Sequence, residues 1–220
     1  AAALPEHDLL GFEKEVLGFY FSGHPLLSVK DQLRAAATHP IDKLTHEMTT
    51  PVRVAGMVNQ IKRMVTKKGD QMARCILEDL SGEMNLLIFP KAYAAGVANQ
   101  LKPGAIVAAS GRLSFKDAAG PESAPELFVD DIQPLDQAVT RYAKRLRLHC
   151  DPEKLPDAAL EDLRHTLEEH EGSCPVILEH ETPEGTALLE LDCRVRVDQK
   201  LLESIGRILG EKSWRIESAS

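Results

Sequence analysis

Residues 52–89 read, in succession, VRVAGMVNQIKRMV, TKKGD, QMARCILED, LSG and EMNLLIF. Three runs of this stretch are rich in valine, isoleucine, leucine and methionine, and each has the length and composition of a β-strand. The polar segments between the runs, Lys67-Lys68-Gly69-Asp70 and Ser81-Gly82, are typical of tight turns. The stretch therefore predicts three consecutive strands joined as a meander, at residues 52–65, 72–79 and 83–89.

The segments at residues 90–134 complete the order of strands and helices that began with the meander. Residues 90–100 contain four alanines and are helix-like, whereas residues 105–115 and 126–134 predict a fourth and a fifth strand around a loop at 117–125. Three strands, a helix and two more strands form the order of the five-stranded OB-fold barrel, and the helix after the third strand separates it from an SH3-like barrel. We therefore expect an OB-fold nucleic-acid-binding domain at residues 51–135.

The segment before the barrel predicts short helices. Apolar residues recur near helical spacing in residues 8–21, and Ser22-Gly23-His24-Pro25 ends that run. A second helix is expected at 26–37, followed by a polar stretch at 42–51. Residues 1–50 thus form a helical linker region in this interpretation.

The segment after the barrel, residues 136–220, alternates strands and helices. After a short helix at 136–144, the expected elements are a strand at 145–150, a helix at 156–170, strands at 175–181 and 186–197, a helix at 199–209 and a strand at 213–217. This β-α-β-β-α-β order predicts a small α+β domain. The fold class of the whole chain is then α+β and multi-domain.

Composition places the chain among globular proteins. Its 220 residues are 43% apolar and 27% charged, which suits one or two domains with real cores. No run approaches the roughly 18 apolar residues of a membrane span, and residues 1–8 lack a targeting pattern, so we expect a cytoplasmic protein that does not bind membranes. Four cysteines lie far apart without a C-x-x-C pair, which predicts free thiols.

Charge is distributed unevenly along the chain. The net charge is -8, yet residues 52–116 carry ten basic and four acidic side chains, a local balance of +6. Residues 151–220 carry eight basic and seventeen acidic side chains, a balance of -9. The basic segment is a plausible footprint for a polyanion, whereas the acidic one disfavours DNA and favours a protein partner.

The first expected hairpin carries the clearest candidate contacts for a nucleic acid. Lys62, Arg63, Lys67 and Lys68 lie where the first strand turns into the second, beside the face that OB barrels use for single strands. Phe115 ends a strand next to Lys116 and a long loop, so it is the aromatic residue that we expect to stack on a base. Phe89, Tyr93 and Phe128 are the other aromatic candidates; Phe89 ranks after Phe115, and most of the set is expected in the core.

No catalytic group is predicted. Glu78-Asp79 could suggest Mg²⁺, but no third carboxylate follows at a usable spacing, and capping of the turn at Ser81 is the simpler interpretation. The eight histidines are scattered, and no nucleophile triad, phosphate-binding glycine loop or aspartate cluster is present. We therefore expect no catalytic residue, metal site or cofactor in this chain.

A family resemblance rests on residues 13–26, EKEVLGFYFSGHPL. This segment resembles a signature of the bacterial replicative polymerases of the C family, the DNA polymerase III alpha subunits, that lies just ahead of their OB domain. Agreement continues at residues 54–56, 64–69, 77–82, 89–90 and 110–112. The resemblance covers essentially the whole chain and becomes less specific toward residue 220.

The resemblance implies a C-terminal region that carries an OB barrel and a final domain. The barrel would contact single-stranded template DNA, and the residues carried over to that role are Lys62, Arg63, Lys67, Lys68, Arg74 and Arg112. The final domain would dock the clamp-loader tau subunit. The Mg²⁺-dependent nucleotidyltransferase centre and the sliding-clamp motif of a DNA-directed DNA polymerase would lie upstream of these residues.

Two other functions stay open at this point. The chain could be a free-standing nuclease that uses Glu78 or Asp79, or a protein-interaction scaffold whose OB barrel does not bind DNA. Binding of a labelled oligonucleotide would separate these hypotheses.

Overall fold

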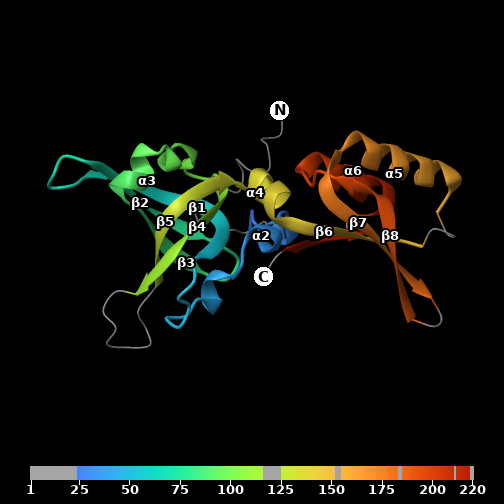
Figure 1. Ribbon diagram of the computed structural model, residues 1–220, viewed down its shortest axis with the longest axis horizontal. Coiled ribbons are helices and arrows are strands. Elements are labelled where there is room, and N and C mark those ends of the chain that lie inside the picture. The colour runs from blue at the N-terminus through green and yellow to red at the C-terminus, as the bar shows by residue number, and fades with distance from the viewer. Residues whose placement is uncertain (1–23, 116–124, 152–154, 183–184, 211, 219–220) are drawn as a thin grey trace, which may run out of the picture.

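The computed structural model describes residues 24–115, 125–151, 155–182, 185–210 and 212–218. Two β-sheet units lie at opposite ends of the molecule, with helices α2 (Lys30–Ala36) and α4 (Leu135–Tyr142) between them (Figure 1). The helix expected at 8–21 lies outside the described residues. Among the residues described, no helix is long and apolar enough to cross a membrane.

The first unit is a closed five-stranded barrel. Its strands are β1 (Val52–Val65), β2 (Gln71–Glu78), β3 (Glu83–Ile88), β4 (Ile106–Phe115) and β5 (Pro125–Pro134). They pair in the order β1-β2-β3-β5-β4, with β4 closing onto β1 and a parallel pair between β3 and β5. Helix α3 (Pro90–Ala94) and a 3-10 turn (Val97–Gln100) connect β3 to β4. This topology is an OB fold, and the predicted barrel is confirmed.

Alternation along the strands builds the barrel core. In β2, Ala73, Cys75 and Leu77 are buried, while the residues between them face outward. Gly56 allows β1 to approach β2 closely, because a Cβ atom there would lie 2.2 Å from the carbonyl oxygen of Glu78. The register of β1 against β2 also shifts between Val58 and Gln60, so the strand bends as it closes the barrel.

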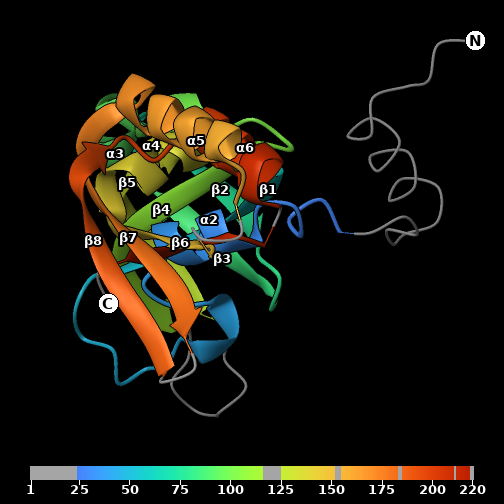
Figure 2. The same cartoon turned by 90° about the vertical axis from the view of Figure 1, so that its right-hand side faces the viewer.

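The second unit is a four-stranded sheet with two helices on one face (Figures 1 and 2). It consists of β6 (Ala143–His149), α5 (Asp157–Glu169), β7 (Glu171–Thr182), β8 (Gly185–Val195), α6 (Gln199–Leu209) and β9 (Trp214–Ser218). The strand order is β8-β7-β6-β9, with β6 and β7 parallel. The predicted β-α-β-β-α-β order is confirmed. Trp214 is half-buried and packs against the core of this unit.

A continuous core joins the two units through α2 and α4. Leu33 of α2 and Val139 of α4 belong to one buried cluster with Met57 of the barrel and Leu146 of the second sheet. Arg53 of β1 strengthens this junction, because its guanidinium lies 3.5 Å from the centroid of the Tyr142 ring and its Nε donates to the carbonyl of Ala36. The region expected to be a linker therefore packs against both sheets.

Candidate nucleic-acid interface

One row of side chains crosses all five strands on the outside of the barrel. Lys62 pairs with Arg74, Arg74 with Leu87, Leu87 with Phe128, and Phe128 with Arg112. Directly paired residues project from the same face of a sheet, and the strand neighbours of this row, such as Cys75, Leu86 and Leu127, are buried inside. We call Lys62, Arg74, Leu87, Phe128 and Arg112 the outer row.

An aromatic pair lies beside the outer row. Phe89 follows β3 and is 41% exposed, and its ring meets that of Phe128 edge to face, with centroids 5.0 Å apart at 86°. An exposed ring held by a second ring offers a pre-ordered surface on which an unpaired base can stack. Phe115, the aromatic residue favoured by the sequence, is half-buried at the end of β4, and its ring lies edge-on to His46 with centroids 6.1 Å apart.

The tip of the β1–β2 hairpin extends away from the barrel (Figure 1). Thr66 organises this turn, because its Oγ1 accepts hydrogen bonds from the backbone N–H groups of Lys68 and Asp70 at 3.3 and 3.2 Å. Gly69 has φ of 90°, a left-handed conformation that glycine adopts without strain. Lys67 and Lys68 are exposed on the turn, as are Lys62 and Arg63 on the strand that leads to it. The hairpin thus carries four exposed cations, two on its turn and two on β1.

Arg74 has partners within the protein. Its Nε donates to Oδ1 of Asn85 at 3.0 Å, and its Nη2 lies 3.2 Å from Oε1 of Glu126, a residue only 3% exposed. Arg74 therefore neutralises a buried carboxylate as well as contributing to the outer row. Arg112 is exposed at the other end of the row, and Lys116 lies outside the described residues.

The sequence did not single out Leu87 or Glu126 as surface contacts of this face, and it offered Phe128 only as one of four aromatic candidates, most of which were expected in the core. The alternation of buried and outward residues in β3 and β5 was the signal that could have placed them, but the parallel pairing of these two strands brings them together only in the folded barrel.

The carboxylates considered for metal binding serve structural roles. Oδ1 of Asp79 accepts from the backbone N–H of Ser81 at 2.6 Å and of Gly82 at 2.9 Å, and Oδ2 accepts from that of Ile41 at 2.8 Å. Glu78 lies 3.0 Å from Nε2 of His24 and accepts a hydrogen bond from Asn59. In the described part of the chain, no three His, Cys, Asp or Glu side chains form a possible metal-binding group.

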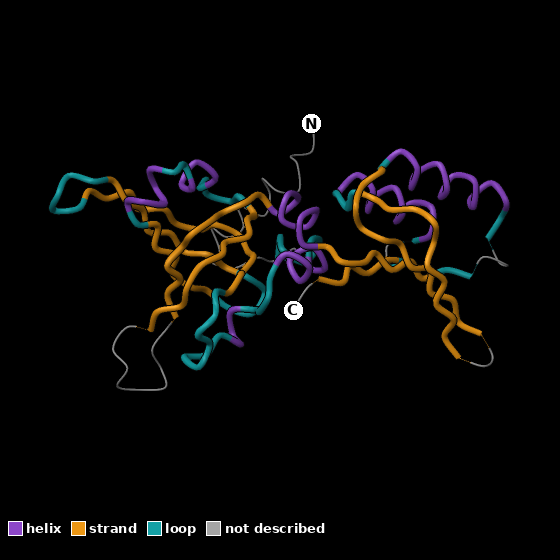
Figure 3. Tube along the Cα trace, in the orientation of Figure 1, coloured by secondary structure: helices purple, strands orange, loops and turns teal. Residues whose placement is uncertain are grey.

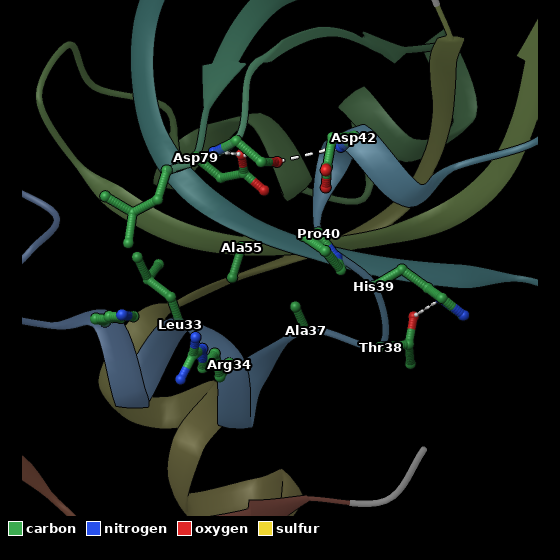
Figure 4. A pocket seen from close by; sticks show the side chains of 12 residues that line it. Leu33, Arg34, Ala37, Thr38, His39, Pro40, Asp42, Ala55 and Asp79 are labelled. Carbon is green, nitrogen blue, oxygen red and sulfur yellow. Dashed lines mark hydrogen bonds between the residues drawn. The ribbon is translucent and has the colours of Figure 1, made fainter.

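A separate cavity of about 350 Å³ lies between α2 and the β2–β3 turn (Figure 4). Leu33, Ala37 and Ala55 form apolar parts of its lining, and Arg34 and Asp42 are charged residues that also line it. It contains no member of the outer row, so we assign it no part in this interface.

A protein-family model covers the residues of the barrel. Residues 52–135 match the tRNA anti-codon family model, described as an OB-fold nucleic acid binding domain. A solved structure of the second single-stranded DNA binding protein from Mycobacterium smegmatis is 20% identical, covering 39% of this chain and 84% of that chain at a TM-score of 0.33.

Sequence similarity to three relatives extends over nearly all of this chain, well beyond the barrel. DNA polymerase III subunit alpha of Halalkalibacterium halodurans is 30% identical over 214 residues, which is 95% of this chain and 18% of that protein. The subunit of Pseudomonas aeruginosa is 31% identical over 89% of this chain, and that of Escherichia coli K12 is 27% identical over 97%. The chain spans less than a fifth of the length of these relatives. Over nearly its whole length it therefore matches a segment of the DNA polymerase III alpha subunits, and residues 52–135 of that segment form an OB-fold domain.

Proposed function

We propose that the chain binds single-stranded DNA through the outer row and the β1–β2 hairpin, as part of a replicative DNA polymerase. The observation that carries this proposal is the outer row itself, in which three cations share one face with Leu87 and Phe128 across all five strands. Cations attract phosphates, and apolar or aromatic side chains accept base faces.

The geometry favours a single strand over a duplex. Phe89 can stack only on a base whose face is uncovered, and the bases of a duplex are already stacked on each other. The hairpin cations Lys67 and Lys68 would hold the backbone without reading bases. Binding should therefore be sensitive to salt and tolerant of sequence.

Fluorescence anisotropy with the full chain tests this function. A labelled single strand should bind with an affinity in the micromolar range at low salt, more tightly than the matched duplex, and its affinity should fall steeply as salt increases. Equal or better binding of the duplex would contradict the proposal. An absence of binding at low salt would favour the scaffold hypothesis.

We further propose that the second sheet unit docks a protein partner, the clamp-loader tau subunit. Its support is the acidic balance of -9 over residues 151–220 together with exposed apolar side chains on β8. Immobilised tau subunit should retain the full chain, and failure to do so would exclude this partner.

The nuclease alternative is less favoured, because the carboxylate of Asp79 already accepts hydrogen bonds from three backbone N–H groups. A metal-dependent cleavage assay with the Asp79→Asn variant addresses it directly. Cleavage that disappears in the variant would restore that alternative.

A further inference from the structure

Strand β8 forms one edge of the second sheet and is unusually exposed. It is paired with β7 on one side and is the last strand of the order β8-β7-β6-β9. All residues at 185–190 are exposed, and Leu188 and Leu189 are 55% and 59% exposed. In Figure 3 this end of the β7–β8 pair projects away from α5 and α6. We call residues 185–190 the outer half of β8.

The rest of β8 carries the features that normally protect an edge strand. The register shifts between the pairs Pro175–Arg194 and Ile177–Glu190, so three residues of β8 lie opposite Val176 alone. Such a bulge, together with the charged Asp192 and Arg194, discourages a further strand from pairing. Helix α5 also contacts β8, and its residues Leu167 and Glu168 line the same hollow as Leu191 and Cys193 of this part of the strand.

The outer half has none of these protections. Its sequence, GTALLE, contains Thr, Ala and two leucines, and its only charge is the terminal Glu190. The pairing with β7 is regular from Glu190 to Gly185. An exposed, regular edge with apolar side chains is a template for an additional strand.

The charges beside the outer half of β8 determine which kind of strand could pair with it. Leu188 pairs with Glu179 and Thr186 pairs with Glu181, so acidic side chains lie on the strand next to the free edge. Residues 179–190 contain four glutamates and no lysine or arginine. Among the described residues, Arg147 lies 3.9 Å from Glu179, but its Nε is only 2.6 Å from Glu217. A second copy of this edge would bring like charges together, whereas a basic strand would complement them.

We propose that an extended protein segment, in which lysine or arginine alternates with apolar residues, adds to the sheet as a fifth strand along the outer half of β8. Backbone hydrogen bonds would supply the register, the leucines would provide apolar contact, and the glutamates would select basic side chains. This inference rests on the docking role proposed above and deepens it by locating the surface.

The test uses the full chain and a fluorescein-labelled peptide of alternating lysine and valine, about eight residues long to match a typical strand. Two matched peptides accompany it: one with glutamate in place of lysine, and one with backbone N-methyl groups along one edge. We expect binding of the first peptide alone, with slowed amide hydrogen exchange confined to β8. The N-methylated peptide keeps the charge, so its failure to bind separates strand addition from simple attraction.

Leu188→Lys should weaken peptide binding by about tenfold or more, because it places a cation where a cation must dock. Leu27→Lys is the matched control, since Leu27 is 56% exposed and lies in another part of the chain. Equal effects of the two substitutions, equal binding of the N-methylated peptide, or exchange protection away from β8 would overturn the inference. A dimer of the wild-type chain in sedimentation that disappears in Leu188→Lys would also overturn it.

The tau experiment separates this inference from the docking role. If tau binds wild type and Leu188→Lys equally well, the surface is wrong and the docking role stands. If tau does not bind wild type, the partner is wrong, and the peptide experiment still decides whether β8 accepts a basic strand.

Discussion

Nη2 of Arg74 on β2 lies 3.2 Å from Oε1 of Glu126 on β5, although β3 runs between these two strands. Asn85 of β3 completes the connection, because its Oδ1 accepts a hydrogen bond from Nε of Arg74. The three side chains link adjacent strands across the outer face of the barrel. Arg74 therefore has a structural role that is separate from any contact with DNA.

Removal of the Arg74 guanidinium should destabilise the barrel. Arg74→Met leaves the carboxylate of Glu126 buried without this partner. We expect the free energy of unfolding to fall by about 1–3 kcal/mol, which is less than for a fully buried ion pair because Arg74 is partly exposed. Urea denaturation measures the change. Arg112→Met is the control, because this exposed residue should change stability by no more than about 0.5 kcal/mol. Equal losses in both variants would contradict the structural role of Arg74.

Phe89 should contribute stacking to DNA binding. Phe89→Leu keeps an apolar side chain but removes the aromatic face, and a stacked base is worth about 1–3 kcal/mol, so the affinity should fall by about 5-fold to 150-fold. The dependence on salt should not change, because no charge is lost. Anisotropy titrations at several salt concentrations measure both quantities. Leu80→Ala, at a position 40% exposed on the β2–β3 turn, should leave the affinity unaltered.

The lysines of the first hairpin should act through charge alone. Lys67→Glu with Lys68→Glu should weaken binding of all sequences alike, and loss of two phosphate contacts should flatten the salt dependence by about 1.4 in the logarithmic slope. Lys30→Glu with Lys43→Glu makes the same charge change outside the barrel strands and serves as the control. If the two double variants behave identically, the hairpin is not a specific contact surface.

Local signals made the barrel predictable from the sequence. The turn at Lys67–Asp70 and the turn at Ser81-Gly82 depend on neighbouring residues only, and the structure places both where the sequence indicates. The alternation around Cys75 and Leu77 likewise identifies an inward face without any knowledge of partners.

The outer row depends on distant pairings, which the sequence does not reveal. Leu87 meets Phe128 only because β3 and β5 are parallel neighbours, and Arg74 meets Glu126 across 52 positions of the chain. For the same reason, the contact of Phe89 with Phe128 could not be predicted, and the sequence placed Phe115 ahead of Phe89 as the stacking residue. The basic hairpin was visible in the sequence, whereas the surface that accompanies it was not.

Because the thiol of Cys75 is buried, the free energy of unfolding should fall as pH rises above about 8.5. Burial raises the pKa of Cys75 to about 12, whereas an unfolded cysteine has a pKa of about 8.5. The stabilisation is thus fully present below pH 8.5 and is lost as pH rises toward 12, at up to about 1.4 kcal/mol per pH unit for this thiol. Cys75→Ala should remove that part of the slope in urea denaturation series between pH 8 and 10.

Iodoacetamide labelling at pH 8 gives an independent check, since the half-buried Cys193 should react before Cys75 in the native chain and both should react alike in urea. Equal native rates, or an unchanged slope in Cys75→Ala, would show that the Cys75 thiol is not sequestered in the barrel core.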